Sequence, residues 1–366
     1  MNHPLRGFTA AAAAVVFLVF AGSAAAATHH VHPGESIQAA IDQAKPGDTI
    51  VVDPGVYSEN LTITKDNLKL EGAGMGETIL QPGVVHPSVC VDPSDPSTVN
   101  GFCVVGDVDF ATGAPIGDAV KGTKIDGFTI RGFPGFGVFL FHADNTSVTN
   151  TEAADNNGYG ISGFVLSGVK FEDDSAHGNG EPGFYVGDSP QAHAHVVGNT
   201  AYANGVGGPD GIGILVRDSS HGDVRDNTVY DNCAGIVFAD TGENPDPVTH
   251  WDAAHNSSNH NNGVCTGEDE GPPPMSGLGI ALLGGQHLNL HENTVLDNVG
   301  GTFPFSGGIV VLDSTGIGGS PPEHDHVNHN TAHGNAPLDI FWDGSGSHNS
   351  FDHNDCTTSV PPSICS

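Results

Sequence analysis

One short pattern, present seven times in the second half of the chain, constrains the fold more than any other feature. Each copy is a six-residue block ending in Asn, followed after a variable gap by a short apolar segment. The blocks are 151–156, 174–179, 199–204, 227–232, 256–261, 293–298 and 330–335. The apolar segments begin at Gly160, Gly183, Gly213, Gly235, Gly279, Gly308 and Leu338, and an earlier one begins at Gly137. Successive starts lie mostly 22 to 31 residues apart, so each unit is expected to form one coil of a solenoid.

The residue types of the repeat predict a parallel β-helix. The apolar segments are too short for helices, and Gly permits the positive φ that tight corners need. Each unit has one apolar face that it cannot bury alone, so successive units must stack. The Asn side chains of stacked units can hydrogen-bond along the pile, and we interpret them as structural rather than functional.

The segments Pro33–Ile41, Gly47–Val52 and Pro54–Tyr57, together with the repeats, resemble the right-handed parallel β-helix proteins of the pectin-lyase-like superfamily. The resemblance runs from residue 34 to the end. It implies an all-β, single-stranded, right-handed parallel β-helix closed at its N-terminal end by a short helix. Ile37 and Ile41 lie at helical spacing, which fits such a cap. The scaffold hosts lyases, hydrolases, esterases, epimerases and non-enzymes, so it does not fix an activity.

We divide the chain into a signal peptide and one domain. The apolar run Phe8–Phe20 follows Arg6 and precedes Ala24–Ala27, a pattern typical of a secretory signal peptide. It is too short and too Ala-rich for a membrane span, and no second hydrophobic stretch is long enough. We therefore expect a secreted, extracellular protein. The expected divisions are signal peptide 1–27, domain 28–366, N-terminal cap about 34–46, loop-rich coils 47–136, regular repeats 137–355 and C-terminal cap 356–366.

Six cysteines fit an exported protein in an oxidising compartment. The predicted disulfides are Cys233–Cys265, Cys90–Cys103 and Cys356–Cys365. In a β-helix the first pair lies at the same corner of adjacent coils, and a strand spacing of about 4.8 Å is within the reach of a disulfide. The second pair would close a small loop, and the third would fasten the C-terminal tail. No Cys-x-x-Cys pair is present, so a thiolate metal site is not expected.

The charge balance is strongly negative, with 10 Lys+Arg against 43 Asp+Glu and a formal net charge of −33. No basic stripe is available to meet phosphates, which excludes nucleic acid as a partner and disfavours anionic lipid. The acidity can simply keep an extracellular surface solvated. Alternatively, some carboxylates hold divalent cations, for which Ca²⁺ with its oxygen ligands is the natural candidate.

One position of the repeat carries Asp in several units and is a specific candidate for a cation site. Aligned on their opening Gly, three consecutive apolar segments place Asp188, Asp218 and Asp240 at one position, and Asp313 repeats it later. Two carboxylates about 4.8 Å apart repel by roughly 3–4 kcal/mol at an effective dielectric constant of about 20. We consider a Ca²⁺ site formed by Asp188, Asp218 and Asp240, and the alternative that each Asp caps the turn that follows it.

Alternation along the same segments predicts an outward face suited to sugars. The predicted substrate-binding residues are Phe139, Phe141, Tyr185 and His142. Aromatic rings can stack on the apolar side of a sugar, while carboxylates and Arg217 bind its hydroxyl or carboxylate groups. The alternative is that loops cover these aromatic side chains.

Long insertions enter one corner of the coil at 205–210, 262–276 and 299–306, and we expect them to form one wall of a groove. The middle insertion carries an acidic tip at 268–270.

Histidine is abundant, with 21 residues. His193 with His195, and His324 with His326, would place two imidazoles on one face of a strand, a candidate transition-metal site. A copper-handling role is therefore one alternative function. Many other histidines occupy turn positions, where we interpret them as solvated turn residues.

The motifs that relatives of this scaffold use for catalysis are not found in place. These are the Asn-Thr-Asp, Asp-Asp and Gly-His-Gly set of polygalacturonases and the Asp-Pro-His-Asp type motif of uronan epimerases. Residues Gly55–Glu59 match the opening motif of pectin methylesterases, but the catalytic segments of those enzymes are not recognisable. Lyases of the scaffold use Arg or Lys as base with Ca²⁺, and Arg217 is the best-placed cation here.

Three functions remain open. The first is a Ca²⁺-assisted uronate polysaccharide lyase with Arg217 and Asp218 as catalytic residues. The second is a non-catalytic module that binds extracellular polysaccharide or serves at the cell surface, and the third is the copper protein. The sequence leaves the oligomeric state open. We expect Arg217→Ala and Asp218→Ala to leave the fold intact.

Overall fold

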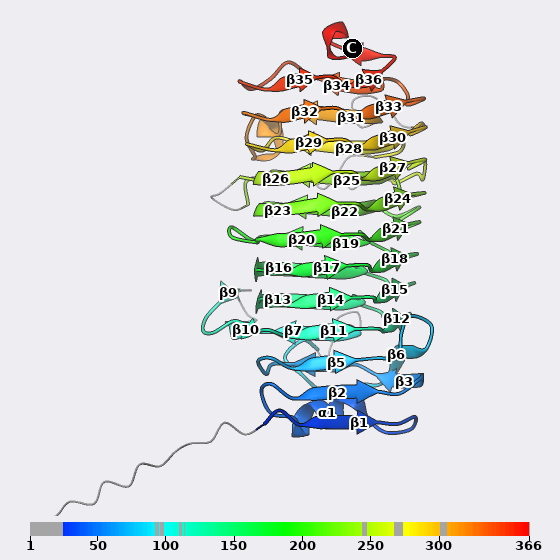
Figure 1. Ribbon diagram of the computed structural model, residues 1–366, viewed down its shortest axis with the longest axis vertical. Helices are drawn as coiled ribbons and strands as arrows, with labels where there is room; N and C mark the ends of the chain where they lie inside the picture. The colour runs from blue at the N-terminus through cyan, green and yellow to red at the C-terminus, as the bar shows by residue number, and fades with distance from the viewer. Residues whose placement is uncertain are drawn as a thin grey trace, which may run out of the picture.

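The computed structural model describes residues 25–91, 95, 99–109, 112, 114–243, 247–266, 274–300 and 306–365. Within these residues the chain winds into a right-handed parallel β-helix, in which most coils contribute one strand to each of three long sheets, A, B and C (Figure 1). The fold predicted from the repeats is confirmed. Apart from residues 25–27, the predicted signal peptide lies outside the described residues. No helix in the described part of the chain is long and apolar enough to cross a membrane.

The strands follow one another along the chain in the order A, B, C. Sheet A contains β1 (Thr28–Val31), β2 (Thr49–Val52), β5 (Lys69–Glu71), β11 (Lys124–Asp126), β14 (Ser147–Thr149), β17 (Lys170–Glu172), β20 (Ala194–Val197), β23 (Ser220–Arg225), β26 (Thr249–Ala254), β29 (Asn289–His291), β32 (His326–Asn328) and β35 (Ser350–Asp352). Sheet B contains β3 (Gly55–Glu59), β6 (Thr78–Val84), β12 (Thr129–Arg131), β15 (Glu152–Ala154), β18 (Ser175–His177), β21 (Thr200–Tyr202), β24 (Thr228–Tyr230), β27 (Ser257–Asn259), β30 (Thr294–Leu296), β33 (Thr331–His333) and β36 (Asp355–Cys356).

Sheet C carries the apolar segments of the repeat. It contains β4 (Leu61–Ile63), β7 (Phe102–Val105), β13 (Val138–Asp144), β16 (Ile161–Ser167), β19 (Phe184–Gly187), β22 (Ile212–Arg217), β25 (Ala234–Ala239), β28 (Leu278–Leu283), β31 (Gly307–Leu312), β34 (Ile340–Trp342) and β37 (Ser359–Val360), and β10 (Val120–Lys121) pairs with β13. A small antiparallel pair, β8 (Val108–Asp109) and β9 (Ala114–Pro115), and two 3₁₀ turns, η2 (Thr315–Ile317) and η3 (Pro362–Ile364), lie in the connections.

The hydrophobic core fills the inside of the coil from end to end. Residues at one register stack directly on one another, and the row that begins Val138, Ile161 and Phe184 is fully buried. Alternate residues of each strand point inward, so every coil adds one layer to the same core.

Two ladders of buried Asn hold the coils in register at the ends of the sheet B strands. The first comprises Asn199, Asn227, Asn256, Asn293, Asn330 and Asn354, and the second comprises Asn156, Asn179, Asn204, Asn232, Asn261, Asn298 and Asn335. In a representative rung, Oδ1 of Asn232 accepts the backbone N–H of Asn204 at 3.0 Å, and Nδ2 of Asn232 donates to the carbonyl of Ala201 at 3.1 Å. The structural interpretation of these residues is therefore confirmed.

The Gly that opens each sheet C strand is required by close packing between coils. A Cβ added to Gly160 would lie 2.5 Å from the carbonyl oxygen of Gly183 and 2.8 Å from Nδ2 of Asn179. The recurrence of this Gly in the repeat thus reflects contact with the next coil and the Asn ladder, whereas positive φ occurs mostly at other corners.

A helix lies where the sequence predicts the N-terminal cap. Helix α1 (Ile37–Gln43) begins after Ser36, whose side chain accepts the N–H of Ala39, and it buries Ile37 and Ile41. It packs against β1, β2 and β4 at the N-terminal end of the coil (Figure 1). Glu59 accepts the N–H of Ile37, so a carboxylate compensates the positive end of the helix. Strand β1, which was not expected from the sequence, pairs with β2 ahead of the cap.

The three predicted disulfides are all present: Cys90–Cys103, Cys233–Cys265 and Cys356–Cys365. The second joins adjacent coils, with 5.9 Å between its Cα atoms, as the coil geometry requires.

Asp325 is a buried carboxyl group in an otherwise apolar and amide-lined stack. Its Oδ1 accepts the N–H of Leu288 at 2.8 Å, and its own N–H donates to Oδ1 of Asn349. Its Oδ2 has no hydrogen-bond partner among the described residues. Burial raises the pKa of Asp325 from 3.8 to about 8.

We therefore predict a pH-dependent gain from Asp325→Asn. Between the unfolded pKa and the raised folded pKa, the folded chain binds one more proton than the unfolded chain, so its free energy of unfolding falls as pH rises through this window. The amide avoids this loss. Its benefit should increase from about pH 5 to about pH 8.5, to a few kcal/mol at most, since one pKa unit is about 1.4 kcal/mol. Urea unfolding at both pH values measures it, with the exposed Asp352→Asn as control. A gain that does not change with pH would contradict the prediction.

Candidate functional site

The residues predicted to point outward lie on the outer face of sheet C. Two rows of side chains cross strands β13, β16, β19 and β22 there. The first row is Phe139, Ser162, Tyr185 and Leu215, and the second row is Phe141, Phe164, Gly187 and Arg217. We call this surface the outer C face. The outward orientation predicted for Phe139, Phe141, Tyr185 and Arg217 agrees with this register.

A cluster of half-buried aromatic side chains covers the N-terminal part of the outer C face. We call it the aromatic platform, and its members are Phe136, Phe139, Phe141, Tyr159 and Phe164. Neighbouring ring centroids lie 5.0 to 6.1 Å apart in tilted or edge-on arrangements. Each ring is partly held by its neighbours and partly exposed, so the platform offers rigid apolar surface to a ligand.

Tyr185 continues the platform but is fully buried. Its ring centroid lies 4.7 Å from that of Phe164 and 4.8 Å from that of Tyr159. Its hydroxyl has no hydrogen-bond partner among the described residues, and burial raises its pKa above the ordinary range, so the phenol stays protonated. Tyr185 therefore supports the platform from beneath rather than offering its own surface.

The C-terminal part of the outer C face is covered. Leu215, Val237 and Ala281 belong to a second apolar cluster outside the coil, together with the Cys233–Cys265 disulfide. Met275, from the long insertion at 262–276, is buried in the same cluster. The loop-covered alternative thus holds for this part, and exposed aromatic surface remains over the earlier coils. The predicted acidic tip at 268–270 lies outside the described residues.

Polar side chains meet at the edge of the platform, around Arg217. The guanidinium donates to Glu243 at 3.0 Å and lies 3.9 Å from Asp188 and 3.8 Å from Asp218. It also lies over the ring of Tyr185, with 5.8 Å from Cζ to the ring centroid. We call Arg217, Asp188, Asp218 and Glu243 the Arg217 cluster.

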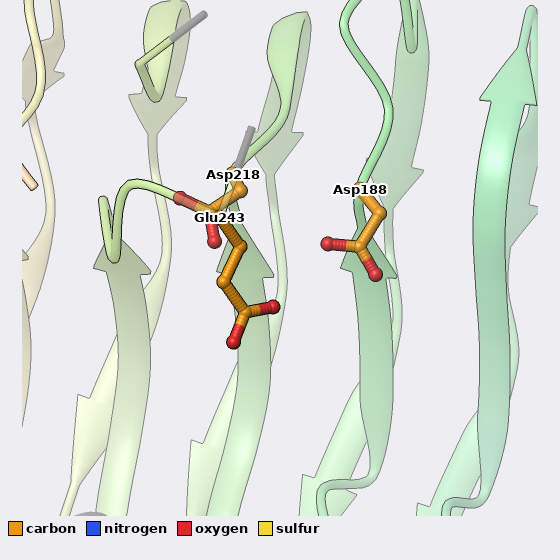
Figure 2. A group of neighbouring side chains, drawn as sticks. All are labelled: Asp188, Asp218 and Glu243. Carbon is orange, nitrogen blue, oxygen red and sulfur yellow. The ribbon is translucent and has the colours of Figure 1, made fainter. Parts of the chain in front are cut away.

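The three carboxylates of the Arg217 cluster come from turns that follow neighbouring strands of sheet C (Figure 2). One oxygen from each lies within 4.8 Å of the other two. Asp188 follows β19, Asp218 follows β22, and Glu243 lies in the turn after β25. Asp218 is fully buried, Asp188 is half-buried and Glu243 is exposed.

The register prediction for the Asp residues is therefore only partly matched by geometry. Asp240 is buried and its carboxylate accepts the N–H and Oγ–H of Ser320, so it is not a member of the cluster. Asp313 accepts from Thr315 in its own turn. Asp313 thus matches the turn-capping alternative, and Asp240 also does, because its Oδ1 accepts the N–H of Gly242 at 3.2 Å. Glu243 takes the place that was predicted for Asp240.

Asp218 both fastens a turn and belongs to the Arg217 cluster. Its Oδ1 accepts the N–H groups of Thr241 and Gly242, at 2.8 and 3.2 Å, and its Oδ2 accepts the hydroxyl of Thr241. It thus fastens the turn of the next coil while one edge of its carboxylate faces Arg217.

Protonation in the Arg217 cluster follows from its burial. Burial raises the pKa of Asp188, and Arg217 opposes this rise. Burial also raises the pKa of Asp218, and its hydrogen bonds from Thr241 oppose it. Burial lowers the pKa of Arg217, but Tyr185, Asp188 and Glu243 outweigh burial and leave the pKa above its usual value. Arg217 therefore stays a cation, which favours a binding role over that of a base.

The donor set of the cluster suits a hard cation in part. Carboxylate oxygens are what Ca²⁺ prefers, and three of them converge here. Ca²⁺ takes 6–8 oxygens, so sugar or water oxygens would complete the shell. Arg217 already neutralises one of the three charges and would have to move aside for the ion.

The predicted histidines fall at separate places. His142 follows Phe141 at the Asp register, has positive φ, and its Nδ1 is 2.9 Å from the carbonyl oxygen of Asp107. Neither predicted pair lies within a strand, because His193 and His324 have positive φ at corners just before β20 and β32. Their partners make other contacts: His195 bonds Asp223, and His326 bonds Ser350.

Four residues of the site were missed from the sequence: Phe136, Tyr159, Phe164 and Glu243. Phe164 shares the register of Phe141, so alignment of its segment would have found it. Phe136 and Tyr159 directly precede the opening Gly residues, where the repeat gives no orientation. Glu243 lies in a turn of irregular length and carries no register signal.

Comparison with known proteins identifies the fold. A family model described as the right handed beta helix region matches residues 112–248. The A-module of the mannuronan C-5 epimerase AlgE4 from Azotobacter vinelandii is 18% identical, with a TM-score of 0.61 over 88% of this chain and 91% of that one. The catalytic unit of a GH87 alpha-1,3-glucanase from Streptomyces thermodiastaticus is 16% identical, with a TM-score of 0.60 over 92% of this chain and 71% of that one. The Dettilon tailspike protein is 13% identical, with a TM-score of 0.54 over 89% and 68%. No curated protein matches the chain.

We predict that Asp218→Ala and Arg217→Ala both leave the fold intact but differ in their effect on stability. Removing the fully buried Asp218 carboxylate leaves the donors of Thr241 and Gly242 without their partner and should lower the free energy of unfolding by about 1–3 kcal/mol. Removing Arg217, which is 31% exposed, should cost less than about 1 kcal/mol. Urea unfolding at neutral pH compares them, and equal losses would show that Asp218 does not fasten the turn.

Proposed function

For a chain that folds as a right-handed parallel β-helix, we infer a secreted protein that binds extracellular polysaccharide on the outer C face. The observation that carries this proposal is the continuity of the aromatic platform with the Arg217 cluster. Rings for stacking and groups for hydrogen bonding lie side by side on one rigid sheet.

The chemistry of a sugar matches this surface. A pyranose ring presents apolar C–H groups on its faces and hydroxyls on its edges, so it needs flat apolar surface next to polar groups. Phe139, Phe141 and Phe164 supply the flat surface. Asp188, Glu243 and Arg217 accept from or donate to hydroxyls at its edge.

The charge of the site bears on the class of polysaccharide. Three carboxylates against one guanidinium give the cluster a negative balance, in a chain with a formal net charge of −33. A polyanion would be repelled unless cations bridge it. The proposal is therefore a neutral polysaccharide, or a uronate polymer in the presence of divalent cations.

Two fold neighbours point to the same class of partner. One is named for mannuronan and another for alpha-1,3-glucan, both polysaccharides. Three disulfides and the apolar run Phe8–Phe20 support secretion into an oxidising compartment.

We predict that Phe139→Ala weakens polysaccharide binding at least tenfold, because each lost aromatic stacking contact is of the order of 1 kcal/mol or more and Phe139 contacts several rings of the platform. Affinity electrophoresis in gels containing single polysaccharides, both neutral glucans and uronates with Ca²⁺, measures the retardation. Tyr230→Ala is the matched control, because Tyr230 stacks on Tyr202 on the outer face of sheet B. Retardation of parent and both variants by the same amount would place binding elsewhere, and no retardation on any polymer would overturn the proposal.

A second candidate, the Ca²⁺-assisted uronate lyase, is favoured by the three converging carboxylate oxygens. Asp188, Asp218 and Glu243 would hold the ion, which would neutralise the uronate carboxylate and make its α-proton more acidic. In this candidate Arg217 would act at the reacting sugar, and Asp218 would keep the following turn in place.

Ultraviolet absorbance of the unsaturated product tests this candidate. If it is correct, uronates incubated with Ca²⁺ give a product that chelator abolishes, and Glu243→Gln lowers its rate at least tenfold because a ligand is lost. Asp313→Asn is the control, since Asp313 caps a turn outside the cluster. Absence of product from every uronate, alongside binding in gels, would leave the binding function without the lyase.

A further inference from the structure

Six histidines form a continuous stack along one edge of the β-helix. They occupy the corner at the start of the sheet A strand in six successive coils, from β20 to β35, either just before the strand or as its second residue. The stack comprises His193, His221, His250, His287, His324 and His348. We call it the His stack.

The coil geometry sets the spacing of the His stack. The residues before the rings pair in parallel across β26, β29, β32 and β35 at Thr249, Gln286, Glu323 and Ser347. The rings themselves lie 4.6 to 5.2 Å apart between centroids, and most of the neighbouring pairs are stacked. Imidazoles are thereby presented at regular intervals over the length of six coils.

Backbone conformation does not by itself explain the run of histidines. All six have φ between 41° and 64°, a region that Asn, Asp, Gly and His all tolerate. The first coils meet the same need at the same corner with Asn67, Gly122, Asn145 and Gly168. The corner before sheet B mixes residue types, at Asn150, Asp173, Gly198, Asp226, His255, Glu292, His329 and His353. The presence of His in six successive coils is therefore not explained by the backbone conformation alone.

The rings are accessible to a ligand. His221 is half-buried, and the other five are exposed. In three of them Nδ1 bonds the hydroxyl of the preceding residue: Ser220 at 2.9 Å, Thr249 at 2.8 Å and Ser347 at 3.1 Å. This leaves Nε2 as the ring nitrogen for a ligand, and the hydroxyl contact helps to fix the ring, as neighbouring contacts do for metal-bound imidazoles.

We propose that the His stack binds first-row divalent transition metals, Cu²⁺, Ni²⁺ or Zn²⁺, between imidazoles of neighbouring coils. Imidazole nitrogen suits these ions, whereas the carboxylates of the Arg217 cluster suit hard cations. Two nitrogens at about 2.1 Å from one ion lie at most about 4.2 Å apart, and an imidazole nitrogen binds an ion in the plane of its ring, so neighbouring rings have to turn out of the stack and point their Nε2 atoms at the ion. The pair His193–His221 is already tilted, by 41°.

This site differs from the two pairs predicted from the sequence. One member of each pair, His193 or His324, belongs to the stack, and its ligand partners lie in adjacent coils rather than two residues away. The stack lies in the same connection from sheet C to sheet A as the Arg217 cluster, with His221 three residues after Asp218. It uses side chains that the Arg217 cluster and the aromatic platform do not use, so metal binding by the stack is tested separately from polysaccharide binding.

Equilibrium dialysis against Ni²⁺ at neutral pH tests the proposal. The parent protein should retain about three ions, because six rings in a row divide into three separate pairs of neighbours. The double variant His250→Asn with His324→Asn leaves His193–His221 as the one adjacent pair of the stack, so it should retain about one ion. Asn is used because it adopts positive φ, so the corners are kept.

The matched control is the double variant His30→Asn with His333→Asn, which removes two imidazoles outside the stack and should retain the parent number of ions. Unchanged circular dichroism and thermal midpoints show that all three proteins are folded. Equal retention by the stack variant and the parent, or loss in the control as large as in the stack variant, would overturn the proposal. So would a parent protein that retains no Ni²⁺.

Discussion

The hydrogen bonds of the two Asn ladders are the interaction on which the rest of this structure depends. At each end of a sheet B strand the chain turns sharply, and the backbone N–H at the turn is buried where no strand can pair with it. An unsatisfied buried N–H costs about 1–3 kcal/mol, and the cost would recur in every coil. Asn meets the need because it accepts the N–H with Oδ1 and uses Nδ2 to bond a carbonyl of the preceding coil. Each rung therefore ties one coil to the next and fixes their register.

Because the register is fixed, a residue type that recurs in the repeat forms a column of like side chains about 4.8 Å apart. Whether such a column is favourable depends on the chemical group. Aromatic rings gain contact, as in the platform and in the Tyr202–Tyr230 pair. Carboxylates repel one another, and each Asp of the column therefore has its own partner. Asp188 lies beside Arg217, Asp218 accepts hydrogen bonds from the turn of the next coil, and Asp240 accepts from Ser320. Imidazoles stack and keep a ring nitrogen for a ligand.

The features of this protein that could be predicted from its sequence are those that recur at the same position in successive coils. The coils, the Asn ladders and the pairing of Cys233 with Cys265 follow from spacing and from stacking alone. The site could be predicted only in part, because its residues also lie in turns that differ in length from coil to coil. Glu243 enters the cluster from such a turn, and Met275 reaches back to cover the outer face beyond Tyr185. The orientation of Asp240 depends on Ser320, 80 residues later, a contact that no local pattern signals. The His stack escaped notice because its corner is aligned only when the positive-φ residues are known.

The two candidate ligand sites illustrate how one scaffold holds different chemistries at different positions of the same coils. The outer C face carries carboxylates, a guanidinium and aromatic rings, a set that selects oxygen-rich ligands such as sugars and hard cations. The His stack, further along the connections to sheet A, presents imidazole nitrogens, a set that selects softer divalent ions. Because each position of the coil repeats its own residue types at the spacing set by the Asn ladders, a change at one position leaves the register of the other intact. Polysaccharide binding and transition-metal binding are therefore separable properties of the same coil, and each depends on side chains that the other does not use.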